Sequence, residues 1–391
     1  MKLEDNRSTT GPKVLEGVRV LDFTCVISGP YCTRMMADLG AEVIKIEPPE
    51  GEIMRAVPPH RDGVSSLFSQ LNAGKRCISL DLKHASAIET VKRLAANVDV
   101  VVENFSPGVM HRLGIDYAVL REVNENLIMC SISGFGQTGP DANRPAFAPV
   151  VHAWSGYDLA TLRYQPEIEK PLNLGPPVAD NVASLQAFGA ITSALYYRER
   201  TGVGQYIDIA MFDALLGTMQ KDFQVRLEPT TNDRLYGPLA ARDGYVMMML
   251  ISPRHFASIC DVVGRPELKS DPRFATTAER LNHYDDLLQI VAAWTAGESA
   301  AAVIEKLTAA KIPVSPYRDL ADMVADPQLR HRGMMTEVHD AAGPLTVPNT
   351  PFLFSATQAT VQPWVAAVGE HNEEILSAQC GLEPAGLQGD G

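Results

Sequence analysis

The sequence has no apolar run long enough to cross a lipid bilayer, which requires about 20 residues. One of its longer apolar runs, residues 245–251, is a typical length for a buried strand. The first residues, MKLEDNRSTTGPK, are polar and lack the apolar segment of a secretory signal peptide. We therefore expect a cytoplasmic protein with no membrane partner.

An excess of basic residues is also missing. The chain has 34 lysines and arginines against 47 acidic residues, a formal net charge of −13. Proteins that bind the phosphate backbone of a nucleic acid present a basic surface, so this charge argues against a nucleic-acid partner. It does not exclude one polyanionic ligand that a few local cations could bind.

Several motifs of common enzyme classes are missing as well. The six cysteines, at positions 25, 32, 77, 130, 260 and 380, lack the paired spacing of a zinc site, and the sequence predicts no metal site. No G-x-G-x-x-G follows the first predicted strand, which argues against a nicotinamide-dependent enzyme. The G-x-S-x-G turn that carries the nucleophile of many serine hydrolases is absent too.

Strand and helix patterns alternate over the first 210 residues, which predicts an α/β domain with a largely parallel sheet, of Rossmann-like type. The predicted strands are the short apolar runs 18–24, 42–46, 76–80, 98–102, 127–132 and 205–209. Helical spacing predicts helices at 30–39 and 85–96, and in the later part of the chain at 255–263, 284–295 and 300–310. The later helices, with a short strand before them, predict a smaller α+β domain.

Asp180 follows a Gly-Pro-Pro run and stands at the start of a predicted apolar helix. An aspartate at this position often caps the helix, because its oxygens accept hydrogen bonds from free backbone amides. The same position suits a nucleophile, because the amides and the helix dipole keep the carboxylate ionised. The residues around Asp180 leave both interpretations open.

Ordered blocks along the chain favour the second interpretation. They are 18–24 (VRVLDFT), Gly29-Pro30, 36–47 (MADLGAEVIKIE), 72–76 (NAGKR), 102–108 (VENFSPG), 133–136 (SGFG) and the segment around Asp180. Together they closely resemble the family III CoA-transferases, the group that contains formyl-CoA transferase and carnitine CoA-transferase. The resemblance runs from about residue 15 to about residue 376, nearly the whole chain.

The resemblance implies an acyl-CoA:carboxylate CoA-transferase that works by covalent catalysis. Asp180 would attack the acyl-CoA to give a mixed anhydride and CoA thiolate, and the thiolate would then form an aspartyl-CoA thioester and release the donor acid. An acceptor acid would reverse these steps. Acyl-CoA and a free carboxylic acid are then the substrates, and no metal or redox cofactor is expected.

The resemblance and the local positive charge also predict the residues that contact CoA: Val26, Lys75, Arg76, Asn104, Phe105, Arg112 and Met211. Asn104 and Phe105 follow a predicted strand, where α/β proteins usually bind ligands. A guanidinium group suits the CoA diphosphate, although Arg112 could equally lie on a solvated surface. Met211 could equally be a core residue.

The acyl pocket is predicted to include Ile27, His152 and Trp154, although His152 could instead be a buried structural histidine. Formyl-CoA transferase has a glutamine in place of Ile27 and a glycine-rich loop that is absent here. We therefore expect poor activity with oxalate and formyl-CoA. A larger or partly apolar acyl group, or a dicarboxylic acid held partly by His152 or Arg144, is expected instead.

The family's architecture implies an interlocked homodimer of ring-shaped monomers. The predicted division is a first part of the large domain at 1–216, with the nucleophile and CoA-binding residues, a linker at 217–235, a small domain at 236–317, a second linker at 318–330 and a return to the large domain at 331–391. A long polar linker is unusual in a compact domain, and a ring closed by two linkers explains it.

Two other functions are weighed against CoA transfer. The α-methylacyl-CoA racemases of the same superfamily exchange a proton with a histidine and an aspartate from a Gly-His-Asp segment. Phe147 and Ala148 occupy those two positions here, so an obvious second base is missing. A protein that only binds acyl-CoA is the other alternative, and the presence of Asp180 argues against it.

Overall fold

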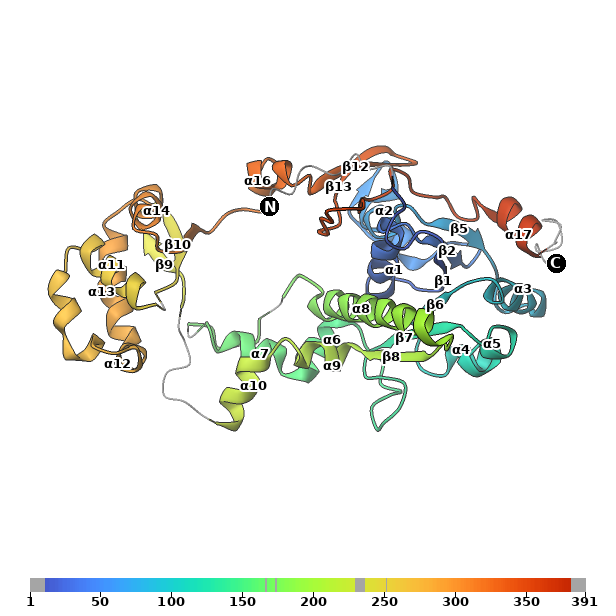
Figure 1. Cartoon of the computed structure of the whole chain (residues 1–391), viewed down its shortest axis with the longest axis horizontal. Helices are drawn as coiled ribbons and strands as arrows, with labels where there is room; N and C mark the ends of the chain where they lie inside the picture. The colour runs from blue at the N-terminus through green and yellow to red at the C-terminus, as the bar shows by residue number, and fades with distance from the viewer. Residues whose placement is uncertain (1–10, 166, 173, 229–235, 251, 381–391) are drawn as a thin grey trace. The chain divides into compact units, whose positions relative to one another are not determined.

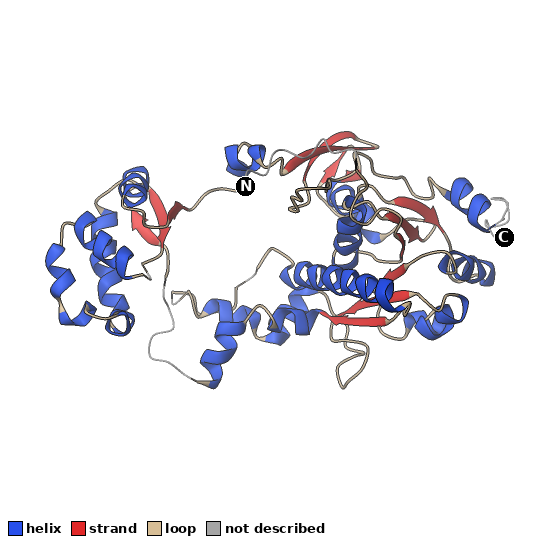
Figure 2. Ribbon diagram, in the orientation of Figure 1, coloured by secondary structure: helices blue, strands red, loops and turns tan. Residues whose placement is uncertain are grey.

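The computed structural model describes residues 11–165, 167–172, 174–228, 236–250 and 252–380 (Figures 1 and 2). Contacts divide the chain into two units. The larger unit comprises Met1–Leu159, Pro171–Met219 and Pro327–Gly391, and the smaller unit comprises Ala160–Lys170 and Gln220–Asp326. Within the described residues, no helix is long and apolar enough to span a membrane.

The larger unit is built on a six-stranded sheet in which every neighbouring pair is parallel, as predicted. In spatial order its strands are β5 (Arg76–Ser79), β2 (Glu42–Glu47), β1 (Arg19–Asp22), β6 (Val100–Glu103), β7 (Ile128–Ser133) and β8 (Tyr206–Ala210). The central strands β6 and β7 are buried at every position, because helices cover both faces of the sheet.

The order of the strands reverses at β1. Val20 pairs with Val43 of β2 on one side and with Val100 of β6 on the other. After β1 the chain builds β2 and β5 outward in one direction, and from β6 it builds β7 and β8 in the other. A crevice therefore opens beyond the carboxyl ends of β1 and β6, the place where open α/β sheets bind ligands.

Helices cover the two faces of the sheet separately, as Figure 2 shows. The apolar core on the first face includes residues of α1 (Ser28–Asp38), α6 (Ala148–Ser155), α8 (Val178–Thr201) and α9 (Met211–Leu216). The core on the second face includes residues of α3 (Ala85–Ala95), α4 (Val109–Leu113), α5 (Tyr117–Val123) and α17 (Asn372–Cys380).

Helix α8 is the long helix that carries Asp180, and small side chains bring it close to the sheet and to α1. Its buried stripe consists of Ala179, Ala183, Ala187, Ile191 and Ala194, spaced three or four residues apart on one helical face. The helix ends at Gly202, whose φ of 71° lies in the left-handed region that favours glycine at such ends.

The remaining elements of the larger unit are short. They are the 3-10 turn η2 (Ile53–Ala56), strands β3 (His60–Arg61) and β4 (Val64–Ser65), helix α2 (Ser66–Asn72), helix α7 (Tyr157–Leu162), which crosses into the smaller unit, helix α16 (Pro327–His331) and the antiparallel pair β12 (Met335–Asp340) and β13 (Gly343–Pro348).

The smaller unit packs helices against an antiparallel sheet, the α+β pattern that was predicted. Its sheet has the order β11 (Val314–Pro316), β10 (Gly244–Met248) and β9 (Leu239–Ala241). Its helices are α10 (Gln220–Leu227), α11 (Pro253–Val262), η3 (Pro266–Ser270), η4 (Pro272–Phe274), α12 (Thr277–Asn282), α13 (Tyr284–Ala296), α14 (Ala300–Ala309) and α15 (Ala321–Val324).

The predicted linkers contain more regular structure than their sequence indicates. Helix α10 lies in the segment predicted as the linker 217–235, of which residues 229–235 are outside the described residues. Its apolar residues Phe223, Val225 and Leu227 alternate with polar ones, which is not a helical pattern, and much of its surface is exposed. The second predicted linker, 318–330, contains α15 and the start of α16.

Candidate functional site

The turn after β1 is held by the end of β6. Asn104, immediately after β6, accepts a hydrogen bond from the Cys25 N–H (2.9 Å) and donates hydrogen bonds to the Cys25 carbonyl oxygen (2.8 Å) and the Ser28 hydroxyl oxygen (3.1 Å). One amide side chain thus fixes both ends of the turn across the crevice between the two strands.

Val26, inside this turn, has a φ of 66°, a left-handed conformation that β-branched residues rarely adopt. Such a conformation costs about 1–3 kcal/mol and persists only where the surroundings enforce it. Its N–H donates to the buried Glu52 carboxylate (2.9 Å), which pairs with Lys45 at 3.0 Å. A Cβ on Gly29 would lie 2.2 Å from the Thr24 side chain, so the chain needs glycine where α1 begins.

Asp180 is the third residue of α8, with 8% of its surface exposed. No side chain caps this helix through its N-cap residue, Pro177. The Ala179 N–H instead donates to the Nε2 atom of His152 (3.0 Å). His152, and not Asp180, therefore accepts this hydrogen bond at the start of α8. The Asp180 carboxylate interacts instead with Ser28 on α1.

Burial raises the pKa of Asp180 to about 6, and hydrogen bonding from the Ser28 side chain and backbone only partly offsets that rise. Helix α1 and helix α8 are tied together here, because the Ser184 hydroxyl donates to the Ser28 carbonyl oxygen (2.6 Å). The carboxylate is thus poorly solvated, yet it is mostly ionised at neutral pH.

A cavity of about 310 Å³ opens in front of Asp180, at the carboxyl ends of β1, β6 and β7. Five predicted site residues lie in its wall: Val26, Asn104, Phe105, Asp180 and Met211. Met211 also belongs to the apolar core, which confirms its interpretation as a core residue, and its contact with CoA stays a prediction. The structure thus brings the predicted nucleophile together with residues from four separate parts of the sequence.

The cavity wall also contains polar residues that were not predicted, of which Ser133 is the most notable. Ser133, at the end of β7, is 6% exposed, and its hydroxyl has no hydrogen-bond partner among the described residues. Arg144, which was expected to hold part of a dicarboxylic acid, lies in the wall too, and among the described lining residues Asp180 and Arg144 are the charged ones. The position of Ser133 after a predicted apolar strand was the available signal for it.

Lys75 and Arg76 lie away from this cavity. The Lys75 ammonium is fully buried and contacts the Asp22 carboxylate (3.1 Å), the Asn72 side chain (2.8 Å) and the Pro30 carbonyl (2.9 Å). Burial opposes ionisation of Asp22, but Lys75, Lys45 and two hydroxyl hydrogen bonds outweigh it and lower its pKa to about 2. The structure places Lys75 in an ion pair that supports the β1 turn.

Arg76 is half-buried and pairs with Glu42 at 2.6 Å and with Glu374. Arg112 is exposed on α4, beside Gly108. Its guanidinium makes no ion pair with other described residues and faces solvent, a placement that a phosphate group could use. Their predicted contacts with CoA stay predictions.

The three residues predicted for the acyl pocket also lie beside the cavity and not in its wall. Ile27 is the residue before α1, and His152 is buried on α6 against the start of α8. Trp154 is 48% exposed, and its ring lies 3.8 Å from the Arg144 guanidinium carbon. Arg144 thus lies in the cavity wall and His152 does not, and the acyl-pocket roles of the three residues stay predictions.

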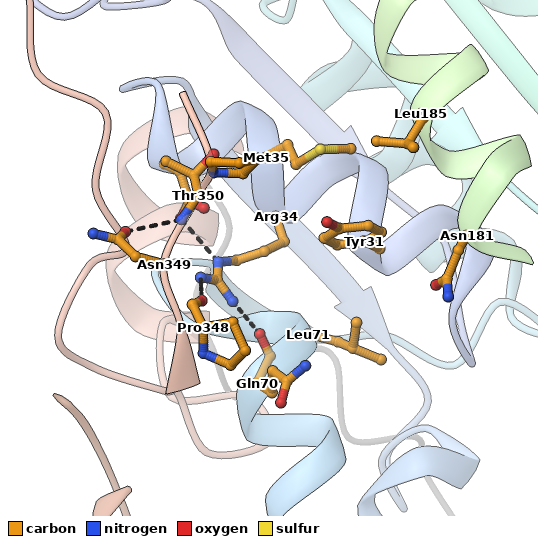
Figure 3. A pocket seen from close by; sticks show the side chains of 12 residues that line it. Tyr31, Arg34, Met35, Gln70, Leu71, Asn181, Leu185, Pro348, Asn349 and Thr350 are labelled. Atoms are coloured by element: carbon orange, nitrogen blue, oxygen red, sulfur yellow. Dashed lines mark hydrogen bonds and ion pairs between the residues drawn. The ribbon is translucent and has the colours of Figure 1, made fainter. Parts of the chain in front are cut away.

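A second cavity, of about 340 Å³, lies between α1, α8 and residues 348–351 (Figure 3). Its arginine, Arg34, is already occupied: Nε donates to Asp38 (2.8 Å), Nη1 to the Gln70 carbonyl and Nη2 to the Pro348 carbonyl (3.3 Å). The guanidinium of this cavity therefore holds chain segments together.

Known proteins are similar to this chain over most of its length. The model of CoA-transferase family III matches residues 15–372. Succinyl-CoA:mesaconate CoA-transferase of Haloarcula hispanica is 31% identical over 93% of this chain and 95% of its own length. Acetyl-CoA:oxalate CoA-transferase of Acetobacter aceti is 35% identical, covering 87% of this chain and 89% of that protein.

Solved structures are also similar to this chain over most of its length. A crystal structure of a CAIB/BAIF family protein from Brucella suis has a TM-score of 0.80 and 31% identity, covering 94% of this chain and 99% of that one. A hypothetical protein from Mycobacterium tuberculosis, Rv3272, has a TM-score of 0.83 and 32% identity, covering 93% of this chain and all of that one. Rv3272 also carries the name "probable fatty acyl-CoA transferase".

Proposed function

The chain belongs to CoA-transferase family III and is a CoA-transferase, and we propose that it moves CoA between carboxylic acids through covalent intermediates on Asp180. The observation that carries the proposal is the carboxylate itself, which is poorly solvated, mostly ionised at neutral pH and open to a cavity at the switch point of the sheet. A desolvated carboxylate attacks a carbonyl more readily than a hydrated one does.

The reaction proceeds in two symmetric halves. An Asp180 oxygen attacks the thioester carbonyl, the C–S bond breaks, and a mixed anhydride and CoA thiolate form. The thiolate attacks the Asp180 carbonyl carbon of the anhydride, which gives an aspartyl-CoA thioester and releases the donor acid as its carboxylate. The acceptor carboxylate attacks that thioester, and the thiolate then attacks the acceptor acyl carbonyl, which regenerates Asp180.

The cavity wall supplies groups for these steps. Ser133 presents a buried hydroxyl without a partner among the described residues, and it can donate to the carbonyl oxygen as negative charge develops there. Val26, Asn104 and Phe105 line the same cavity and would contact the thioester end of CoA in this scheme. CoA is a substrate in this scheme, and the residues named need no further cofactor for the steps described.

Substitution of Asp180 tests the proposal. Asp180→Ala and Asp180→Asn should lower the transfer rate by roughly 10³-fold or more, because no other group can carry the covalent intermediate. Fold and CoA binding, measured by circular dichroism and calorimetry, should be retained. Asp213→Ala is the matched control, because Asp213 is an exposed aspartate in the first turn of α9.

A trapping experiment separates this function from the alternatives. Wild-type enzyme incubated with an acyl-CoA and hydroxylamine should carry a hydroxamate at Asp180, found by peptide mapping. Incorporation of solvent deuterium at the α-carbon of a branched acyl-CoA would instead indicate racemisation. Binding of acyl-CoA with neither result would identify a non-catalytic protein, and full activity of Asp180→Ala would rule out the mechanism.

A further inference from the structure

We propose that Arg144 is a carboxylate-binding residue that makes this enzyme specific for acyl-CoA thioesters of short dicarboxylic acids. The inference rests on the proposed function, since it names the substrate class of the same cavity. Among the described residues, Asp180 and Arg144 are the charged groups in the cavity wall, and they carry opposite signs. A thioester with a free carboxylate at its far end has one group for each.

The Arg144 guanidinium is held in place by an aromatic ring and a carboxylate. Its central carbon lies 3.8 Å from the Trp154 ring centroid, and the Trp154 ring packs edge-on against Phe135 with centroids 6.2 Å apart. Stacking of this kind orients the planar guanidinium at little further entropic cost. The side chain is thus partly pre-organised before a substrate arrives.

Arg144 also has hydrogen-bonding capacity to spare. Its Nε and Nη2 atoms both donate to a single oxygen of Asp141, at 3.0 and 2.8 Å. Its Nη1 atom makes no hydrogen bond with any other described residue. A carboxylate can therefore bind through Nη1 and the second N–H of Nη2 while Asp141 stays on the adjacent Nε–Nη2 edge. Arg34 in the second cavity, which is bonded through all three nitrogens, offers no such edge.

The size and polarity of the cavity agree with a short acid. Its volume of about 310 Å³ is at the lower end of the range for small-molecule sites, and it must also accept the thiol end of CoA. A long fatty acyl chain would exceed this space and leave Arg144 without a partner. Six of the relatives carry names with succinyl-CoA or succinate as a substrate, of which the mouse succinyl-CoA:glutarate CoA-transferase is one.

The test compares two donors of equal chain length, succinyl-CoA and butyryl-CoA, which differ in a terminal carboxylate and a terminal methyl group. Wild-type enzyme should show the higher kcat/KM with succinyl-CoA. Arg144→Gln should lower kcat/KM for succinyl-CoA by about 10- to 100-fold, as for a lost charged hydrogen bond, and change butyryl-CoA by less than about threefold. Arg144→Lys should recover part of the loss.

Two further variants sharpen the result. Asp141→Asn removes the competing charge, so it should lower the KM for succinyl-CoA and leave that for butyryl-CoA unchanged. Arg121→Gln, an exposed arginine on α5 under the opposite face of the sheet, should change neither donor. Equal losses with both donors in Arg144→Gln would show that Arg144 acts only on the fold, which overturns the inference.

Equilibrium binding keeps this inference separate from the chemistry of Asp180. Calorimetry with the Asp180→Asn protein measures the affinities for succinyl-CoA and butyryl-CoA without turnover. Tighter binding of succinyl-CoA that disappears in the Asp180→Asn, Arg144→Gln double variant supports the role of Arg144 even if the covalent mechanism fails. Equal affinities for the two donors, or preferred binding of a long-chain acyl-CoA, would overturn it.

Discussion

At the scale of single residues, the burial of Asp180 predicts how the rate of CoA transfer depends on pH. The carboxylate reacts only when ionised, and burial raises its pKa to about 6. We therefore expect kcat/KM to fall as the pH is lowered through about 6, approaching tenfold per pH unit below it, whereas an exposed aspartate would stay active to about pH 4. A pH–rate profile with a saturating acceptor measures this limb.

Two substitutions assign that limb to Asp180. Ser28→Ala removes a hydrogen bond that favours the ionised form, so the limb should move to higher pH. Glu103 is the competing source, since burial raises its pKa to about 7 in the wall of a neighbouring cavity. Glu103→Gln should leave the limb in place, and its disappearance in that variant would contradict the assignment to Asp180.

At the scale of elements, the start of α8 depends on a contact from another helix. His152 on α6 accepts the Ala179 N–H through Nε2, which requires the neutral ring, and burial lowers the pKa of His152 in agreement with that state. A buried amide without a partner costs about 1–3 kcal/mol. His152→Leu should therefore lower the free energy of unfolding by about that amount, and lower kcat because Asp180 is one residue away.

His152→Gln is the conservative partner of that variant, because a glutamine carbonyl oxygen can accept the same hydrogen bond. It should restore most of the stability, measured by urea denaturation, and most of kcat. If His152→Gln were as stable as wild type but as inactive as His152→Leu, the imidazole would contact the substrate, as the acyl-pocket prediction had it. The pair of variants therefore separates positioning from direct participation.

Helices and strands could be predicted from the sequence where residues close together in the chain determine them. The strands β1, β2, β6 and β7 were predictable because burial on both faces gives each of them a short run of adjacent apolar residues, such as residues 100–102 of β6. Helix α10 was not, because its apolar residues alternate and its formation depends on contacts such as that of the Tyr164 hydroxyl with Asp222 (3.1 Å), which are distant in sequence.

The site shows the same limit. Asn104 was predicted from its place after a strand, and Asp180 from the ordered blocks along the chain that resemble the family. That Lys75 is a buried partner of Asp22 was not, because the two residues are 53 positions apart and only the folded sheet brings them together. Arg144 likewise has an Nη1 donor that is free among the described residues because of how its guanidinium contacts Asp141 and Trp154, and no sequence pattern specifies those contacts.

At the scale of the whole molecule, several large apolar side chains of the larger unit are exposed. Leu185, Tyr196 and Tyr197 on α8 are exposed by 48%, 66% and 49%, and Phe147 near the Asp180 cavity by 66%. Exposed apolar residues mark a protein interface where they form a contiguous patch. The interlocked homodimer implied by the family would bury exposed apolar side chains of this kind.

An interlocked dimer predicts that association and folding are one event. Two threaded rings cannot separate without unfolding, so light scattering should give a dimer down to the lowest measurable concentration, and the unfolding midpoint should depend on protein concentration under reversible conditions.

Specific cleavage within the 217–240 segment would open such a ring, and we expect it to abolish both the dimer and CoA transfer. Cleavage in the C-terminal tail after residue 383 is the matched control and should affect neither. A folded, active monomer at low concentration would contradict the interlocked assembly, but it would leave the chemistry of Asp180 intact, because every described residue in that cavity wall belongs to one unit of one chain.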